Sequence, residues 1–213
     1  MEKEQQKFYG EAAQSIAPYG FLMAFFTLIY SLFFGKAWGL IGWLIFALAA
    51  ACSVYIACMS LRNIKHANRF EVYESLEGQR IKKQMGLLSA VTYTGVWISG
   101  LILAYFGLNS FIFPTVTLII GLHFIPQAKI MNRTVDYFVA PFPILSALSA
   151  IYLAFVSDMR WYVLWSVAGI GGACATLIYG FYLLSVYRKT AEKFGIPYKQ
   201  REAFKDCLKE RRR

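Results

Sequence analysis

Residues 38–61 read WGLIGWLIFALAAACSVYIACMSL and contain no charged side chain. An α-helix needs about 20 predominantly apolar residues to cross the hydrocarbon core of a bilayer. A strand of a membrane β-barrel is about half as long and alternates polar with apolar residues, which this stretch does not do. The stretch therefore predicts one transmembrane helix.

Five further apolar runs complete the pattern. They lie at residues 16–34, 85–106, 110–128, 137–155 and 161–187. Hydrophobic residues make up 58% of the 213 residues and charged residues 16%, and the mean hydropathy is +0.46, outside the usual range of soluble domains. Short turns alternate with longer charged loops, as in an up-down bundle. We predict an all-α, polytopic membrane domain of six transmembrane helices over residues 1–187, followed by a basic tail at 188–213.

The basic residues divide the loops into two sets. All but two of the 22 Lys and Arg residues lie in the N-terminal segment, in loops 62–84 and 129–136, or in the tail, whereas the opposite loops carry only Lys36 and Arg160. Cytoplasmic loops of membrane proteins are enriched in Lys and Arg, so both termini are expected in the cytoplasm, an N-in/C-in topology. Four tryptophans near the outer ends of the spans agree with an interfacial belt: Trp38, Trp43, Trp161 and Trp165.

The ends of the chain indicate where it resides. The charged N-terminal segment MEKEQQK and its first apolar run are followed by no small-residue cleavage site, so we expect no removable signal peptide. Short loops then fit a bacterial inner membrane. The net charge of +10 comes from basic residues beside the spans, which predicts membrane lipids rather than nucleic acid as partners.

Two polar segments have more than one interpretation. The sequence VYESLEGQRIKK within 62–84 is either a coil or a helical extension into water. In the tail, Phe204, Cys207 and Leu208 share one face among basic residues, which predicts a cytoplasmic amphipathic helix on the membrane surface. That helix would anchor the topology, sense lipids or dock a protein partner.

The fourth span holds the polar residues that point to a site. His123 lies at hydrocarbon depth, and Gln127 follows it at i+4 on the same helix face. Pro126 cannot donate to the carbonyl of Leu122, so a kink that frees this carbonyl is expected. The alternative is that a neutral His123 only hydrogen-bonds a neighbouring helix and holds the bundle together.

Aromatic residues at similar depth extend the predicted site. Tyr55, Tyr93 and Tyr179 lie roughly 8 to 12 residues from the inner ends of their helices, close to the level of His123. Trp97 lies near the middle of its span, where an indole N–H needs an acceptor or a cavity, although packing is its alternative role. The predicted ligand-binding residues are His123, Gln127, Tyr93, Trp97, Tyr55 and Tyr179.

Residues after the fourth span have a structural interpretation. Asp136 precedes Pro141 and Pro143 and is expected to cap the start of the fifth span or to interact with its dipole. The prolines predict an irregular start of that helix. We see no carboxylate within a span, where proton-coupled pumps usually have one.

The stretch 121–141 also resembles a known pattern. It matches G-x-H-F-x-P…Y-x-x-A-P through Gly121, His123, Phe124, Pro126, Tyr137, Ala140 and Pro141. This pattern looks like that of an uncharacterised family of small bacterial six-helix membrane proteins. The resemblance implies a six-helix fold with a shared His–Pro element, and it implies no activity.

Function is therefore predicted from what the sequence contains and lacks. There is no G-x-S-x-G or HExxH motif and no phosphate-binding glycine loop, and the four cysteines have no metal-site spacing, so neither a cofactor nor a metal is predicted. The leading hypothesis is a binding or transport protein with an intramembrane cavity for a small or lipid-like molecule. The alternatives are a non-catalytic scaffold or regulator and a membrane-embedded enzyme that uses His123.

Overall fold

The computed structural model describes residues 2–72, 74–196 and 198, with side chains from residue 6 onward. Within these residues the chain is helical: α1 (Glu2–Ser31), α2 (Phe34–Ala67), α3 (Leu76–Tyr105), α4 (Asn109–Met131), α5 (Thr134–Val139), α6 (Pro141–Val156) and α7 (Trp161–Lys193). Six segments are long and apolar enough to cross a membrane, with α5 and α6 forming the fifth together. The predicted all-α bundle of six spans is thereby confirmed, and it suits a multi-pass membrane protein.

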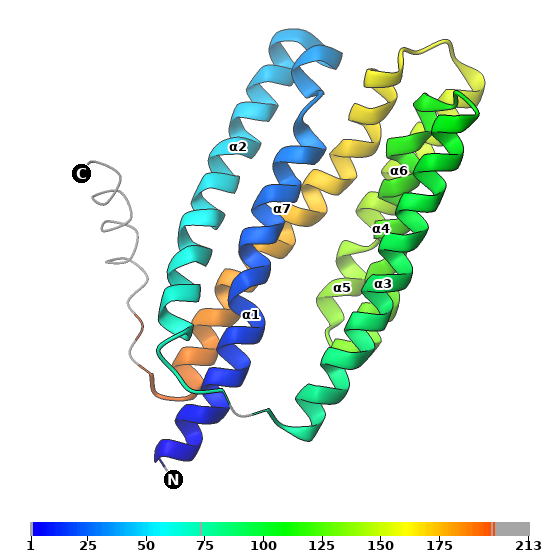
Figure 1. Cartoon of the computed structure of the whole chain (residues 1–213). Coiled ribbons are helices and arrows are strands. Elements are labelled where there is room, and N and C mark those ends of the chain that lie inside the picture. Colours follow the sequence, from blue (N-terminus) through cyan, green and yellow to red (C-terminus); the bar gives the residue numbers. More distant parts are fainter. Residues whose placement is uncertain (1, 73, 197, 199–213) are drawn as a thin grey trace.

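The helices form two groups that meet at α7 (Figure 1). In the first group, α2 packs against α1 and both pack against α7. In the second, α3 packs against α4, and α4 packs against α6. Because α7 also packs against α4 and α6, it is the helix that holds the two groups together.

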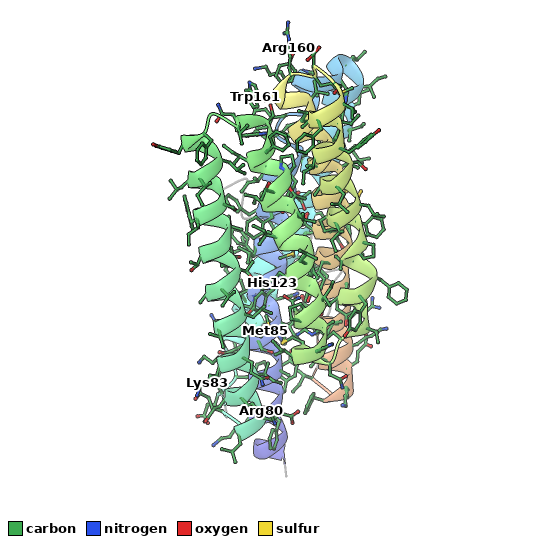
Figure 2. All side chains as sticks on the ribbon, turned by 90° about the vertical axis from the view of Figure 1, so that its right-hand side faces the viewer. Arg80, Lys83, Met85, His123, Arg160 and Trp161 are labelled. Carbon is green, nitrogen blue, oxygen red and sulfur yellow. The ribbon has the colours of Figure 1, made fainter. Side chains whose placement is uncertain are left out.

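The two ends of the bundle differ in charge. Figure 2 shows Arg80 and Lys83 at one end and Arg160 with Trp161 at the other. The start of α1, the α2–α3 connection and the end of α7 all lie at the first end (Figure 1). The structure therefore separates basic and less basic loops as the sequence predicts, while the assignment of the basic end to the cytoplasm stays a prediction.

Several helices extend beyond the predicted spans. The hydroxyl of Ser75 accepts a hydrogen bond from the backbone N–H of Gly78 at 3.0 Å and so caps α3. Ser75 in turn donates to the carboxylate of Glu11 at 2.8 Å, which ties the start of α3 to α1. Of the two interpretations of segment 62–84, the helical extension is thus correct from Leu76 onward.

Two boundaries are irregular. The first lies in the sequence GKAWG at 35–39, where α2 breaks at Trp38 and Gly39 and Gly39 has the positive φ of 58° that glycine adopts readily. The fifth span is split into α5 and α6, and α6 begins at Pro141. This agrees with the predicted irregular start, because Pro141 and Pro143 have no N–H with which to continue the hydrogen bonds of α5 into α6. The predicted tail helix at 204–208 lies outside the described residues.

Small residues allow the helices to approach α7 closely. A β-carbon on Gly169 would collide with the backbone carbonyl of Tyr30 in α1, and one on Gly171 would collide with that of Phe142 in α6. Small-residue contacts of this kind drive helix association in lipid, where the hydrophobic effect between helices is absent. The hydroxyls of Thr27 and Thr176 add a buried 2.8 Å hydrogen bond between α1 and α7.

A polar cluster joins α1, α2 and α7 at the basic end of the bundle. The ring Nδ1 of His66 lies 2.8 Å from the hydroxyl of Tyr187 and 3.3 Å from that of Tyr9. Tyr187 donates to the backbone carbonyl of Asn63 at 3.0 Å, so its single proton is used there and His66 is the donor to Tyr187. These bonds fix the ends of three helices against one another.

Replacing Gly171 by Ala should destabilise the bundle by about 1–3 kcal/mol, because the new methyl group must displace the α6 backbone. Gly100→Ala in α3 is the matched control, since no atom lies within 4 Å of the added carbon. It should be neutral or slightly stabilising. Denaturant unfolding of the detergent-solubilised variants measures both, and equal stability of the two would contradict the packing described for α7.

An N-in/C-in topology predicts where introduced thiols react. In a background with all four cysteines replaced by alanine, Cys at position 36 or 160 should react with a membrane-impermeant maleimide in intact cells. Cys at position 82, exposed at the basic end, should react only after lysis. The opposite labelling pattern would reverse the predicted orientation.

Candidate ligand groove

A groove of about 120 Å³ lies between α1, α3, α4 and α7. Its apolar wall includes Leu22, Phe26 and Tyr30 from α1, and Ile120 and Phe124 from α4. The groove exists because, among the described residues, α3 packs closely only against α4 and not against α1. Figure 2 shows Met85 of α3 and His123 of α4, which both line the groove, close to each other along the length of the bundle.

A hydrogen-bond chain begins on the α3 side of the groove. Thr92, the one buried residue of α3 within the described chain, has its hydroxyl 2.8 Å from Nδ1 of His123. The Nε2 of His123 lies 3.1 Å from Oε1 of Gln127, one turn further along α4. Since an amide oxygen only accepts, Nε2 carries the proton, and Nδ1 of the neutral ring accepts from Thr92. Both ring nitrogens of His123 are therefore occupied.

The chain continues through Gln127 to two further groups. Its amide nitrogen donates to Oδ1 of Asp136 and to the hydroxyl oxygen of Tyr179, each at 3.1 Å. Tyr179 also accepts from Nη1 of Arg133 at 3.0 Å. Three helices and the α4–α5 turn are thus linked, because Thr92 belongs to α3, Gln127 to α4 and Tyr179 to α7.

The position of Arg133 follows from how α4 ends. Asn132 adopts a left-handed conformation with φ 50°, which Asn tolerates better than most residues. The next backbone N–H, that of Arg133, then returns to the carbonyl of Ala128 at 3.0 Å. The chain reverses at this point, so Arg133 lines the groove beside the last turn of α4.

The structure brings together four of the six predicted site residues. His123, Gln127, Tyr93 and Tyr179 all line the groove. Trp97 does not, because its side chain is 71% exposed on the outer face of α3. The expectation that Trp97 lines a cavity or packs in the interior is therefore corrected. The sequence could not show this, because α3 is apolar around its whole circumference and no pattern marks its inner face.

Tyr55 also lies apart from the groove. It is half-buried on α2 and stacks on Phe181 of α7, with 6.1 Å between the ring centroids. Equal depth along the helices placed Tyr55 in the predicted site, but α2 lies behind α1 and α7 as viewed from the groove. Depth alone does not report which side of a bundle a residue faces.

Asp136 has the position of a dipole partner, one of its two predicted roles, but not that of a cap. It lies in the first turn of α5, whereas the N-cap position is Arg133 and no side chain caps the helix. Its side chain is fully buried, with Oδ1 bonded to Gln127 and Oδ2 without a partner among the described residues. The expectation that no span contains a carboxylate is also corrected, because Asp136 falls within the segment Thr134–Val156.

The groove contains polar residues that the sequence did not single out. Arg133 is the one charged residue among the described groove-lining residues, and Ser89 and Tyr19 contribute hydroxyls. Arg133 was counted only as a topology charge, and the i+3 spacing of Ser89 and Thr92 on one α3 face was the signal available for those two. No group of three His, Cys, Asp or Glu side chains that could hold a metal occurs among the described residues.

Comparison of the chain with protein-family models, with curated proteins and with solved structures found no match. The resemblance of residues 121–141 to a known family therefore stays a prediction.

A double-mutant cycle at Thr92 and His123 tests whether their bond holds α3 on α4. Thr92→Val keeps the side-chain shape and should cost about 1 kcal/mol, because it leaves Nδ1 of His123 without a donor. His123→Leu should cost more, since Thr92 and Gln127 both lose their partner. The double variant should cost less than the sum by roughly 0.5–1 kcal/mol, measured by denaturant unfolding in detergent.

Ser99→Ala is the control for this cycle, because the Ser99 hydroxyl bonds only to the carbonyl of Val96 in its own helix. It should change stability little and show no coupling to His123→Leu. Additive costs for Thr92→Val and His123→Leu would mean that the two side chains do not interact.

Proposed function

We propose that this chain is a multi-pass membrane protein that binds a small or lipid-like molecule in the groove between α1, α3, α4 and α7. The observation that carries the proposal is the groove itself, which combines an apolar wall with a polar end formed by Gln127, Arg133 and Tyr179. Ligand sites in proteins typically combine a mainly apolar lining with a few convergent polar groups. Because the groove opens between helices, we propose that the bound molecule is transported.

The weak attachment of α3 supports access from the lipid. Only 6% of the most apolar part of α3 is buried, whereas 61% of that of α7 is buried. Because α3 is held mainly by α4, the gap between α1 and α3 is the side from which a molecule dissolved in the bilayer reaches the groove. We further propose that the basic end faces the cytoplasm of a bacterial cell, so that the polar end of the groove is near the inner leaflet.

The hydrogen bonds of His123 favour a structural role for this residue, which is the second candidate function. Both ring nitrogens are engaged by Thr92 and Gln127, which is the arrangement of a structural histidine in a scaffold. In a binding protein the same bonds position α3 at the edge of the groove. An enzymatic role of His123 as an acid or base would require one of these bonds to open first.

Filling the groove tests the proposal. Ser89→Trp should occupy the space between α3 and α1 and lower the occupancy of co-purified small molecules or lipids by about tenfold, because the apolar channel is blocked. Ala90→Trp is the matched control, since Ala90 is the next residue along α3 and is exposed on the lipid side. Native mass spectrometry of gently extracted protein measures the bound species, and unchanged occupancy in Ser89→Trp would contradict the proposed site.

A further inference from the structure

Arg133 is the feature of the groove that identifies a ligand class. A guanidinium group has five N–H donors and no acceptor. In the described residues it forms one hydrogen bond, from Nη1 to Tyr179, and it forms no ion pair. The nearby carboxylate of Asp136 accepts from Gln127 instead. Arg133 therefore presents uncommitted donors and a positive charge to the groove that it lines.

The remaining polar groups of the groove agree with an acceptor-rich head group. Ser89 and Tyr19 line it, and neither hydroxyl forms a hydrogen bond with another described residue. Hydroxyls can donate to an anion, and arginine binds carboxylate and phosphate oxygens in pairs. No acidic side chain lines the described groove, so nothing there opposes a negative charge directly.

The apolar part of the groove indicates what is attached to that head group. Along α1 the lining runs from Tyr19 to Tyr30, which is about 16 Å of helix. A volume of about 120 Å³ distributed along that length makes the groove narrow, so an extended single chain suits it better than a bulky ring system. Arg133 follows the last turn of α4, at the end of the bundle where lipid head groups would lie.

We infer that the groove binds a single-chain anionic amphiphile from the membrane, with its carboxylate or phosphate on Arg133 and its chain along α1 and α4. This inference rests on the proposed function and specifies the charge of the ligand. Asp136 and Gln127 act as positioning residues, because Gln127 donates to Oδ1 of Asp136 and to Tyr179, while the Arg133 guanidinium bonds to Tyr179 and not to the carboxylate.

The experiment compares three amphiphiles of equal chain length: decanoate, decanol and decyltrimethylammonium. Native mass spectrometry of the full chain in a neutral detergent gives an apparent Kd for each. Decanoate should bind about tenfold tighter than decanol, and decyltrimethylammonium should bind weakest. Arg133→Gln should weaken decanoate binding about tenfold and leave decanol binding unchanged, while Arg133→Lys, which keeps the charge, should give an intermediate Kd for decanoate.

Lys129→Gln is the matched control, because Lys129 is an exposed cation in the last turn of α4, close to Arg133 in the sequence, and does not line the groove. Lys129→Gln should leave all three affinities unchanged. If it weakens decanoate binding as much as Arg133→Gln does, the binding depends only on general surface charge and the inference is overturned. Thermal melting of Arg133→Gln and Arg133→Lys establishes that both are folded.

Two further outcomes separate the inference from the function on which it rests. If decanoate and decanol bind equally and Ser89→Trp weakens both, the groove binds amphiphiles but the anionic head group is wrong. If Ser89→Trp changes the binding of neither decanoate nor decanol, the groove itself is not the site. Competition by acetate or inorganic phosphate as strong as that by decanoate would indicate a soluble anion, which also overturns the assignment of a membrane amphiphile.

Discussion

The close approach of α1 and α6 to the glycine residues of α7 is the contact on which the rest of the bundle depends. Gly169 faces the backbone of Tyr30, and Gly171 faces that of Phe142, so two helices lie against α7 at backbone distance. In a membrane such contacts gain dispersion energy and buried hydrogen bonds rather than hydrophobic free energy. With α6 fixed in this way, α4 packs on α6 and α7, and α3 in turn packs on α4.

The groove is a consequence of that order of packing. Each step away from α7 has fewer small-residue contacts, and α3 has no glycine whose added β-carbon would meet a neighbouring helix beyond its N-terminal turn. The Thr92–His123 bond supplies a specific attachment instead, at the one buried position of α3. A helix held by a polar contact and one neighbour leaves space on its other side, and that space faces α1.

How much of this could be predicted depends on the physical rule involved. The six spans follow from the thickness of the bilayer, and the pairing of His123 with Gln127 follows from helical periodicity. The lipid-facing position of Trp97 could not be predicted, because α3 is apolar around its whole circumference and its rotation is set by packing. Arg133 and Asp136 were missed as site residues because their positions depend on the left-handed turn at Asn132, which the sequence does not specify.

The separation of Arg133 from Asp136 by neutral groups explains how a charged residue can be both stable and available. A direct ion pair would satisfy the guanidinium and close the groove to an anion. Here Gln127 and Tyr179 lie between the two charges. Gln127 donates to Asp136 and to Tyr179, and Tyr179 accepts from Arg133. The carboxylate still offsets the positive charge at longer range, which lowers the cost of placing Arg133 beside apolar residues. Arg133 is half-buried and lines the groove, whereas Asp136 is fully buried and does not, so the guanidinium is the charge that the groove presents.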